Sequence, residues 1–133
     1  MNNDLLHSSV IELSTDHLRA NANFIRSITG KNCILSFVIK GNAYGHGIEQ
    51  MVPMAEMVGI DHFSVFSSDE AARALAVKGE DSRIMIMGYI ADEMLPWAIE
   101  NGISFFSNQN PSNTFIFLIW NANDKAIFHG LFN

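Results

Sequence analysis

Cysteine is nearly absent from this sequence, which contains only Cys33. One thiol cannot form an intramolecular disulfide, and no second cysteine is available to complete a thiolate metal site. A disulfide-stabilised secreted domain is therefore excluded. Because Cys33 directly precedes an apolar run, we expect it to be a buried thiol. This cysteine usage predicts a reducing compartment, and we expect a cytoplasmic protein.

Positive charge and long apolar runs are also scarce. Eight Lys+Arg against fourteen Asp+Glu give a formal net charge of −6, which argues against a nucleic-acid partner because phosphate contacts need clustered positive charge. The longest apolar run is residues 115–120, far short of the roughly 20 residues that span a bilayer. The amino terminus has no basic region followed by an apolar stretch, so we expect neither a signal peptide nor a membrane partner.

The sequence does contain enough apolar residues for one packed domain. Of its 133 residues, 48% are hydrophobic and 17% are charged, a balance typical of a compact globular chain. The charges are uneven, because only Asp124 and Lys125 lie beyond residue 104. The last stretch instead combines phenylalanine and asparagine without a helical or strand period.

The first hundred residues alternate between strand-like and helix-like segments. Short apolar runs are followed by polar capping residues and then by apolar residues at helical spacing, as in βαβ units. This rhythm fits an open doubly wound sheet or part of a (β/α)₈ barrel, and periodicity alone does not choose between them. The expected strands are 9–13, 34–39, 62–66, 83–87 and 103–106, and the expected helices are 14–30, 47–58, 67–76 and 92–100.

Helix boundaries follow from capping residues. Ser14, Thr15 and Asp16 supply side-chain oxygens suited to an N-cap, Asp92 is another expected N-cap, and Gly30 is an expected C-cap. Glu70 lies near a helix start, where its charge favours the macrodipole. Pro53 predicts either a helix start close by or a kink.

One segment calls for a chemical interpretation: Phe37-Val-Ile-Lys-Gly-Asn-Ala-Tyr-Gly-His-Gly47. Lys40 comes at the carboxyl end of an apolar strand, where the active sites of α/β folds gather. Partial desolvation there favours the neutral amine that Schiff-base formation requires. The alternative is a lysine that extends to solvent beside an ordinary turn. His46 has no second histidine or carboxylate at ligand spacing, so no metal site is expected.

Residues 38–47 resemble the cofactor-attachment signature of the alanine racemases, which usually reads Lys-Ala-Asn-Ala-Tyr-Gly-His-Gly. Gly41 is the one departure. The likeness extends from Ser9 to about Phe106, through Phe63-Ser-Val65, Asp69-Glu-Ala71 and residues 84–88. Other pyridoxal-phosphate barrels share a strand ending in lysine but lack the Tyr-Gly-His-Gly continuation.

The resemblance implies an α/β chain that forms about the N-terminal half of a (β/α)₈ barrel. It also implies an isomerase that interconverts L- and D-alanine and so supplies D-alanine for the cell wall. Lys40 would form an internal aldimine with pyridoxal 5'-phosphate and act as one of two acid/base groups. Tyr44 would hydrogen-bond the cofactor phosphate. The family enzyme is a homodimer.

We expect residues 1–106 to form a partial barrel domain, and the resemblance stops at about Phe106. We interpret the tail, 107–133, as translation in a shifted frame or a spurious extension, and we expect the C-terminal β domain with its opposing tyrosine to be absent. This chain is then expected to be inactive by itself. Alternatives are a non-catalytic fragment or interaction module, a racemase of broader specificity, and a small stand-alone α/β protein in which Lys40 is ordinary.

Overall fold

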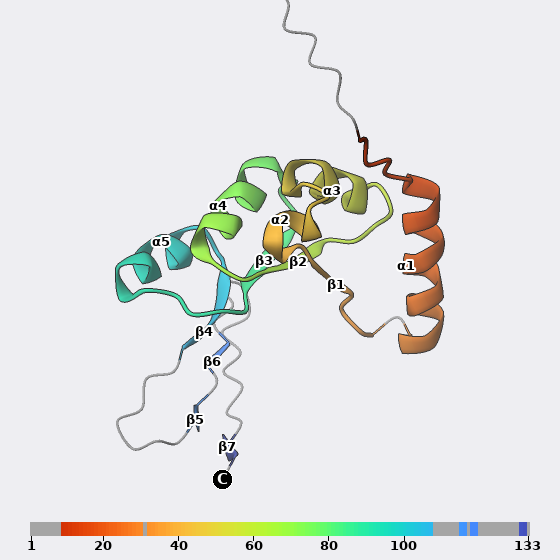
Figure 1. Cartoon of the computed structure of the whole chain (residues 1–133). Coiled ribbons are helices and arrows are strands. Elements are labelled where there is room, and N and C mark those ends of the chain that lie inside the picture. The colour runs from red at the N-terminus through yellow and green to blue at the C-terminus, as the bar shows by residue number, and fades with distance from the viewer. Residues whose placement is uncertain (1–8, 31, 108–114, 117, 120–130, 133) are drawn as a thin grey trace, which may run out of the picture.

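A computed structural model describes residues 9–30, 32–107, 115–116, 118–119 and 131–132 (Figure 1). Strands and helices alternate through the first hundred residues, as the sequence predicts. The helices are α1 (Thr15–Thr29), α2 (Lys40–Tyr44), α3 (Ile48–Glu56), α4 (Ser68–Val77), the 3₁₀ turn η1 (Asp92–Met94) and α5 (Leu95–Glu100). The strands are β1 (Ser36–Val38), β2 (His62–Val65), β3 (Arg83–Ile86), β4 (Ser104–Ser107), β5 (Phe115–Ile116), β6 (Leu118–Ile119) and β7 (Leu131–Phe132).

The sheet topology distinguishes between the two architectures that the sequence left open. Strands β1 to β4 are parallel and lie side by side in chain order. Helices α3, α4 and α5 all lie on one side of these strands (Figure 1). A doubly wound sheet has helices on both faces and a reversal of strand order, whereas a barrel keeps sequential order with its helices outside. The described part of this chain is therefore built as a segment of a (β/α) barrel.

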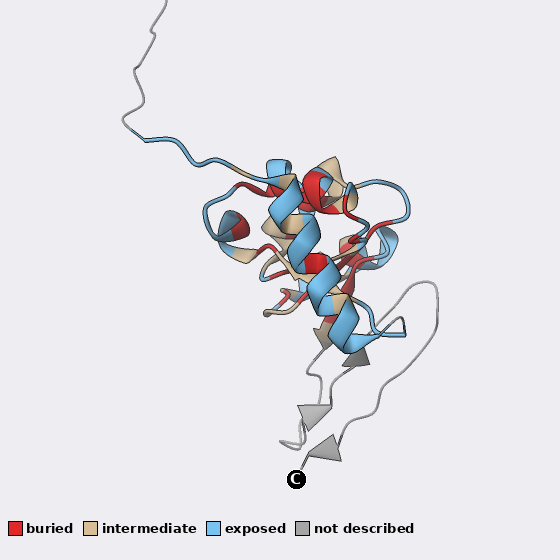
Figure 2. Ribbon diagram, turned by 90° about the vertical axis from the view of Figure 1, so that its right-hand side faces the viewer, coloured by how far each residue is buried: buried red, intermediate tan, exposed pale blue. Residues whose placement is uncertain are grey.

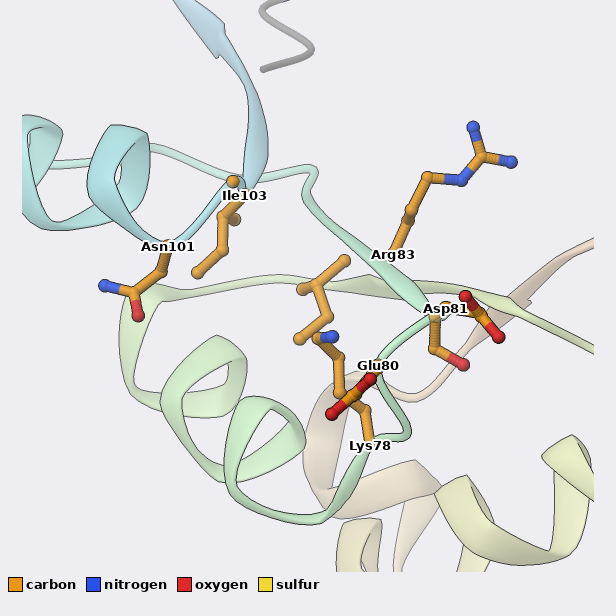
Figure 3. A pocket seen from close by; sticks show the side chains of 9 residues that line it. Lys78, Glu80, Asp81, Arg83, Asn101 and Ile103 are labelled. Carbon is orange, nitrogen blue, oxygen red and sulfur yellow. The ribbon is translucent and has the colours of Figure 1, made fainter. Parts of the chain in front are cut away.

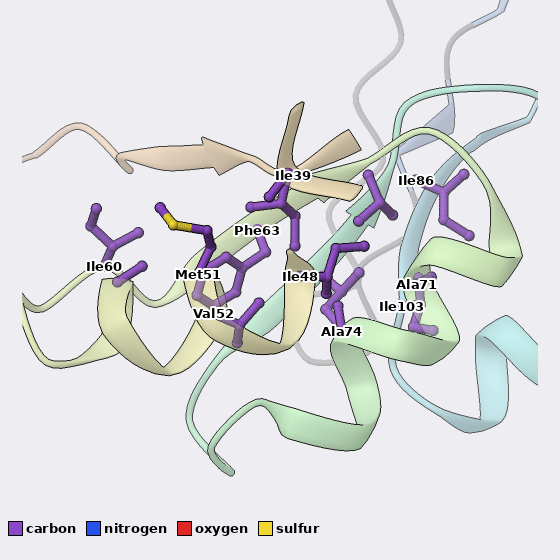
Figure 4. Packing of buried hydrophobic residues seen from close by; sticks show 14 of the residues in the cluster. Ile39, Ile48, Met51, Val52, Ile60, Phe63, Ala71, Ala74, Ile86 and Ile103 are labelled. Carbon is purple, nitrogen blue, oxygen red and sulfur yellow. The ribbon is translucent and has the colours of Figure 1, made fainter. Parts of the chain in front are cut away.

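The hydrophobic core lies between the strands and these helices (Figure 4). Because side chains alternate along a strand, the register aligns rows of apolar residues on the helix-facing side. One such row runs Val65, Ile86 and Phe105 across β2, β3 and β4, and each of these residues is buried, as is Ile39 directly after β1. Apolar burial of this kind stabilises a fold by about 25 cal/mol per Å². The core thus includes Ile39, the residue directly before Lys40.

Helix α1 is peripheral. Ser14 caps it by accepting a hydrogen bond from the His17 amide at 3.3 Å, and Gly30 ends it with φ 80°, both as predicted. Ala22 is its one buried residue, and most of its length is exposed (Figure 2). Arg26 anchors the helix by donating to the Val58 and Gly59 carbonyls at 3.1 and 2.6 Å.

Several local predictions were wrong. Residues 9–13 form no strand, and Val10 is 80% exposed, because no described segment pairs with them. Cys33 is exposed, since β1 begins only at Ser36 and the residues before it lie outside the sheet. The helix expected over 92–100 is split into η1 and α5, and Asp92 does not cap it, because Ala91 holds the cap position. Pro53 lies inside α3, which begins at Ile48, so the helix does not start at Pro53, and the alternative of a kink there stays a prediction.

The tail 107–133 lies mostly outside the described residues, so its expected origin stays a prediction. Its described pieces are three short strands. Strand β6 pairs antiparallel with β4, and β5 pairs antiparallel with β7. In the described part of the chain, no helix combines the length and apolar character needed to cross a bilayer.

Candidate active site

Lys40 lies at the carboxyl edge of the parallel sheet. The residue before it, Ile39, is fully buried, and its amide continues the β1–β2 ladder by donating to the Ser64 carbonyl at 2.8 Å. Lys40 itself is half-buried and is the first residue of α2. The structure therefore places Lys40 where the sequence predicts, at the carboxyl end of the first parallel strand, separated from it by the buried Ile39.

The backbone after Lys40 makes a left-handed turn. Gly41, Asn42, Ala43 and Tyr44 all have positive φ, between 52° and 61°. A residue with a Cβ in this conformation costs roughly 1–2 kcal/mol, and three of the four carry one. Strain of this kind persists only where the surroundings determine the conformation, and it is concentrated at functional sites.

Hydrogen bonds within the segment close the turn and lead into α3. The Ala43 amide donates to the Ile39 carbonyl at 2.8 Å, and the Gly47 amide donates to the Asn42 carbonyl at 2.9 Å. The Asn42 side chain accepts from the Ile48 amide at 3.2 Å, the first residue of α3. Gly45 and Gly47, with φ 90° and 91°, supply conformations that other residues avoid.

Helix α4 contributes two side chains that hold this turn, and sequence reasoning missed both. Glu70 Oε1 accepts from the Gly41 amide at 2.6 Å, and Glu70 Oε2 accepts from the Phe66 amide at 2.8 Å. Arg73, one turn further along α4, donates to Asn42 Oδ1 at 2.6 Å.

Arg73 is itself fixed by Glu49 of α3. Its Nε and Nη2 donate to the two Glu49 oxygens, both at 2.7 Å. This pairing lowers the pKa of Glu49 and raises the pKa of Arg73, because the hydrogen bonds favour both charged forms. The two α4 residues, Glu70 and Arg73, are three positions apart and therefore lie on one helix face. This spacing is the sequence signal that could have indicated their shared role.

Tyr44 ends the left-handed turn that follows Lys40, and the five-residue element α2 contains both predicted site residues. The Tyr44 side chain is 65% exposed, and its phenol is therefore accessible to a ligand at this edge. A Cβ added at Gly41 or Gly45 would meet nothing within 4 Å, so space is open beside the backbone on either side of the turn.

The neighbouring strand ends pack closely at the same edge. The Gly88 amide donates to the Phe66 carbonyl at 3.1 Å. A Cβ at Gly88 would lie 2.3 Å from that carbonyl oxygen and 2.9 Å from the Phe66 ring. Only glycine permits this approach.

A polar network crosses the sheet nearer the amino ends of the strands. Ser36 Oγ lies 2.6 Å from Ser64 Oγ and 2.8 Å from His62 Nδ1. Burial, and next the charge of Arg83, lower the pKa of His62. Ser36 is four residues before Lys40, so this network belongs to the sheet interior and not to the edge that carries Lys40.

A cavity of about 280 Å³ lies at the opposite, amino-terminal edge of the sheet, beside the starts of β3 and β4 (Figure 3). Its lining comes from residues that precede or begin these two strands. Active sites of parallel sheets gather at the carboxyl edge, so this cavity is separate from the Lys40 site. The labelled lining residues are Lys78, Glu80, Asp81, Arg83, Asn101 and Ile103.

Sequential parallel strands, helices on one face and a lysine at a strand's carboxyl end are typical of a segment of a (β/α) barrel. The chain matches the family model described as "Alanine racemase, N-terminal domain" over residues 13–109. It therefore belongs to the alanine racemase family. The predicted fold class is confirmed.

Curated relatives agree with this assignment. The chain is 34% identical over 94 residues to alanine racemase 1 of Caldanaerobacter subterraneus, covering 71% of this chain and 24% of that protein. It is 42% identical over 86 residues to the alanine racemase of Leptospira interrogans, covering 63% and 21%. The chain thus spans about a quarter of the length of these relatives.

Solved structures show the same fold. The alanine racemase of Oenococcus oeni superposes with a TM-score of 0.66 at 29% identity, over 73% of this chain and 26% of that one. The alanine racemase of Bartonella henselae, described with covalently bound pyridoxal phosphate, gives 0.64 at 23% identity over 72% and 28%. A histidine racemase of Leuconostoc mesenteroides gives 0.65 at 26% identity over 76% and 27%.

Proposed function

We propose that this chain carries the cofactor-attachment segment of a pyridoxal-phosphate-dependent amino-acid racemase, with Lys40 as the attachment residue. The observation that supports this most directly is the folded form of residues 40–47. A half-buried lysine leads into a strained turn at the carboxyl edge of the sheet. Family membership agrees, and pyridoxal phosphate is described as covalently bound in the Bartonella henselae relative.

The residues present fit such a group. Lys40 supplies an amine, Tyr44 supplies an exposed phenol, and the backbone at Gly41 and Gly45 leaves open space beside them. Pyridoxal phosphate held there would supply an aldehyde within reach of the Lys40 amine and an electron-withdrawing ring that makes the substrate Cα proton removable. In this proposal the Lys40 amine also holds and moves the Cα proton. The Tyr44 hydroxyl donates to the cofactor phosphate and orients it.

Alanine as substrate, a homodimer, a cytoplasmic location and a role in cell-wall D-alanine supply belong to the same proposal, on the strength of the family. A different amino-acid substrate is the second candidate. The histidine racemase resembles this chain in fold to almost the same degree as the Oenococcus oeni enzyme. Assaying proton exchange with a panel of amino acids distinguishes the two.

Borohydride trapping tests the attachment. The 133-residue chain is incubated with pyridoxal phosphate, reduced, digested and mapped by mass spectrometry. We expect the adduct at Lys40, its loss in Lys40→Ala, and its retention in the matched control Lys78→Ala, since Lys78 lies outside the signature. Adduct spread evenly over the four lysines of the chain would contradict the proposal.

A racemisation assay tests the activity. Inverting Cα needs a second proton-transfer group on the opposite face. In the family that this chain resembles, the residue that supplies this second proton-transfer group lies outside the segment matched here. We therefore expect no D/L-alanine exchange from the 133-residue chain, and measurable exchange would contradict this expectation.

A further inference from the structure

The side chain of Glu70 departs from the local pattern that its sequence position predicts. Ser67 and Glu70 have the spacing of a capping box, and Ser67 Oγ accepts the Glu70 amide at 3.3 Å. In that motif the glutamate reaches back to the amide of the capping residue. Here Glu70 reaches past Ser67 to the Phe66 amide and across to Gly41, 29 residues away in the chain.

The two oxygens of Glu70 thereby join two strand ends. Gly41 directly follows Lys40 after β1, and Phe66 directly follows β2. An ionised carboxylate offers acceptors on both oxygens, so it satisfies both amides at once. A glutamine of the same size has one acceptor oxygen and one NH₂ group, which must face one of the two amide donors without bonding it.

The turn after Lys40 needs such external contacts. Three residues with a Cβ adopt the left-handed conformation in succession, which an isolated chain avoids. Helix α4 contacts the turn at its first residue through Glu70 and at its second residue through Arg73. Glu70 bonds the peptide that joins Lys40 to Gly41, whereas Arg73 bonds the side chain of Asn42, so the contact of Glu70 is nearer to Lys40 along the chain.

We propose that Glu70 is a positioning residue for Lys40: its carboxylate holds the Gly41 amide against the end of β2 and so sets the direction in which the Lys40 side chain leaves the sheet. This inference rests on the proposed attachment of pyridoxal phosphate at Lys40. The part of it that concerns the backbone is measurable without the cofactor.

The test uses the 133-residue chain, Glu70→Gln, and Asp69→Asn as matched control. Asp69 is the adjacent acidic residue of the same helix turn, it is exposed, and its side chain makes no hydrogen bond within the described residues. The first readout is hydrogen exchange of single amides by NMR, with Ile84 and Ile86 of the core as internal reference. The second is the rate of Lys40 labelling by pyridoxal phosphate and borohydride.

We expect Glu70→Gln to raise exchange at Gly41 or Phe66 about tenfold or more, since bonds to charged acceptors are among the stronger ones. The Ile84 and Ile86 amides should keep their wild-type rates. Labelling of Lys40 should slow by a similar factor. Asp69→Asn should change neither readout.

The outcomes separate the two proposals. Unchanged exchange at both amides in Glu70→Gln would overturn the role of Glu70, and so would an equal rise at the core amides, which reports general destabilisation. Faster exchange with unchanged labelling would show that Glu70 holds the turn without positioning Lys40, and would also overturn the inference. If the wild-type chain is not labelled at Lys40, the proposed function fails, while the exchange data still decide whether Glu70 holds the backbone.

Discussion

Replacing Phe63 with alanine should remove the largest contribution of one side chain to this core. Phe63 is 0% exposed on the helix-facing side of β2, between Met51 and Val52 of α3 and the neighbouring strands (Figure 4). Phe→Ala changes at such sites cost about 3–5 kcal/mol, because burial is lost and a cavity remains. A domain of this size is stable by about 5–15 kcal/mol in total. We therefore expect Phe63→Ala to remove a large part of the folding free energy.

Phe66→Ala is the matched control. Phe66 lies three residues further along the chain and is 57% exposed. Less than half of its side-chain surface is covered, so the same chemical change should cost about 1 kcal/mol.

Urea denaturation followed by circular dichroism measures both variants. With a slope of about 2 kcal/mol per M, Phe63→Ala should lower the midpoint by about 2 M and Phe66→Ala by about 0.5 M. Equal shifts for the two variants would refute the assignment of the core to the helix-facing side of the sheet.

Three further predictions use the same denaturation assay. Gly88→Ala should destabilise the chain by about 2–3 kcal/mol, since the added Cβ meets the Phe66 carbonyl, which no rotamer change relieves; a neutral effect would contradict this packing. Gly41→Ala should cost only about 1 kcal/mol, because its Cβ meets no neighbour and only the left-handed φ of 61° opposes it; a larger loss than in Gly88→Ala would be inconsistent with the open space beside the turn. Burial, and next Arg83, lower the pKa of His62 below its ordinary 6.5, so the unfolded chain binds this proton at higher pH and stability should fall as pH drops below about 6.5. His62→Asn should flatten that dependence between pH 7.5 and 5, and an unchanged slope would show that His62 does not cause it.

The pattern of elements was largely predictable from the sequence. Ile34 to Ile39 and Ile84 to Ile86 are short apolar runs, and each contains residues of a parallel strand, although the first strand is shorter than expected and Ile34 is exposed. Ser14 and Ser67 begin helices and Gly30 ends one, each through hydrogen bonds to residues close to it in the chain. One prediction that depended on a distant partner was wrong. Residues 9–13 had the composition of a strand, but a strand needs a paired neighbour, and composition does not supply one.

The site divides in the same way. The sequence alone showed Lys40 at the end of an apolar run and the glycines that follow it. The resemblance of residues 38–47 to the family signature predicted the family. The left-handed path of residues 41–44 was not visible, because no local propensity favours three consecutive residues with a Cβ at positive φ.

The sequence by itself determined the order of strands and helices, the family and the position of the candidate lysine, since each depends on residues close together in the chain. Only the tertiary structure decided that the helices cover one face of the sheet and that Glu70 and Arg73 hold the turn after Lys40. From the sequence alone, the position of Glu70 near a helix start was already explained by its favourable interaction with the helix macrodipole. Its bond to Gly41 arises because parallel strands bring their carboxyl ends together at one edge, and that proximity is a property of the folded sheet.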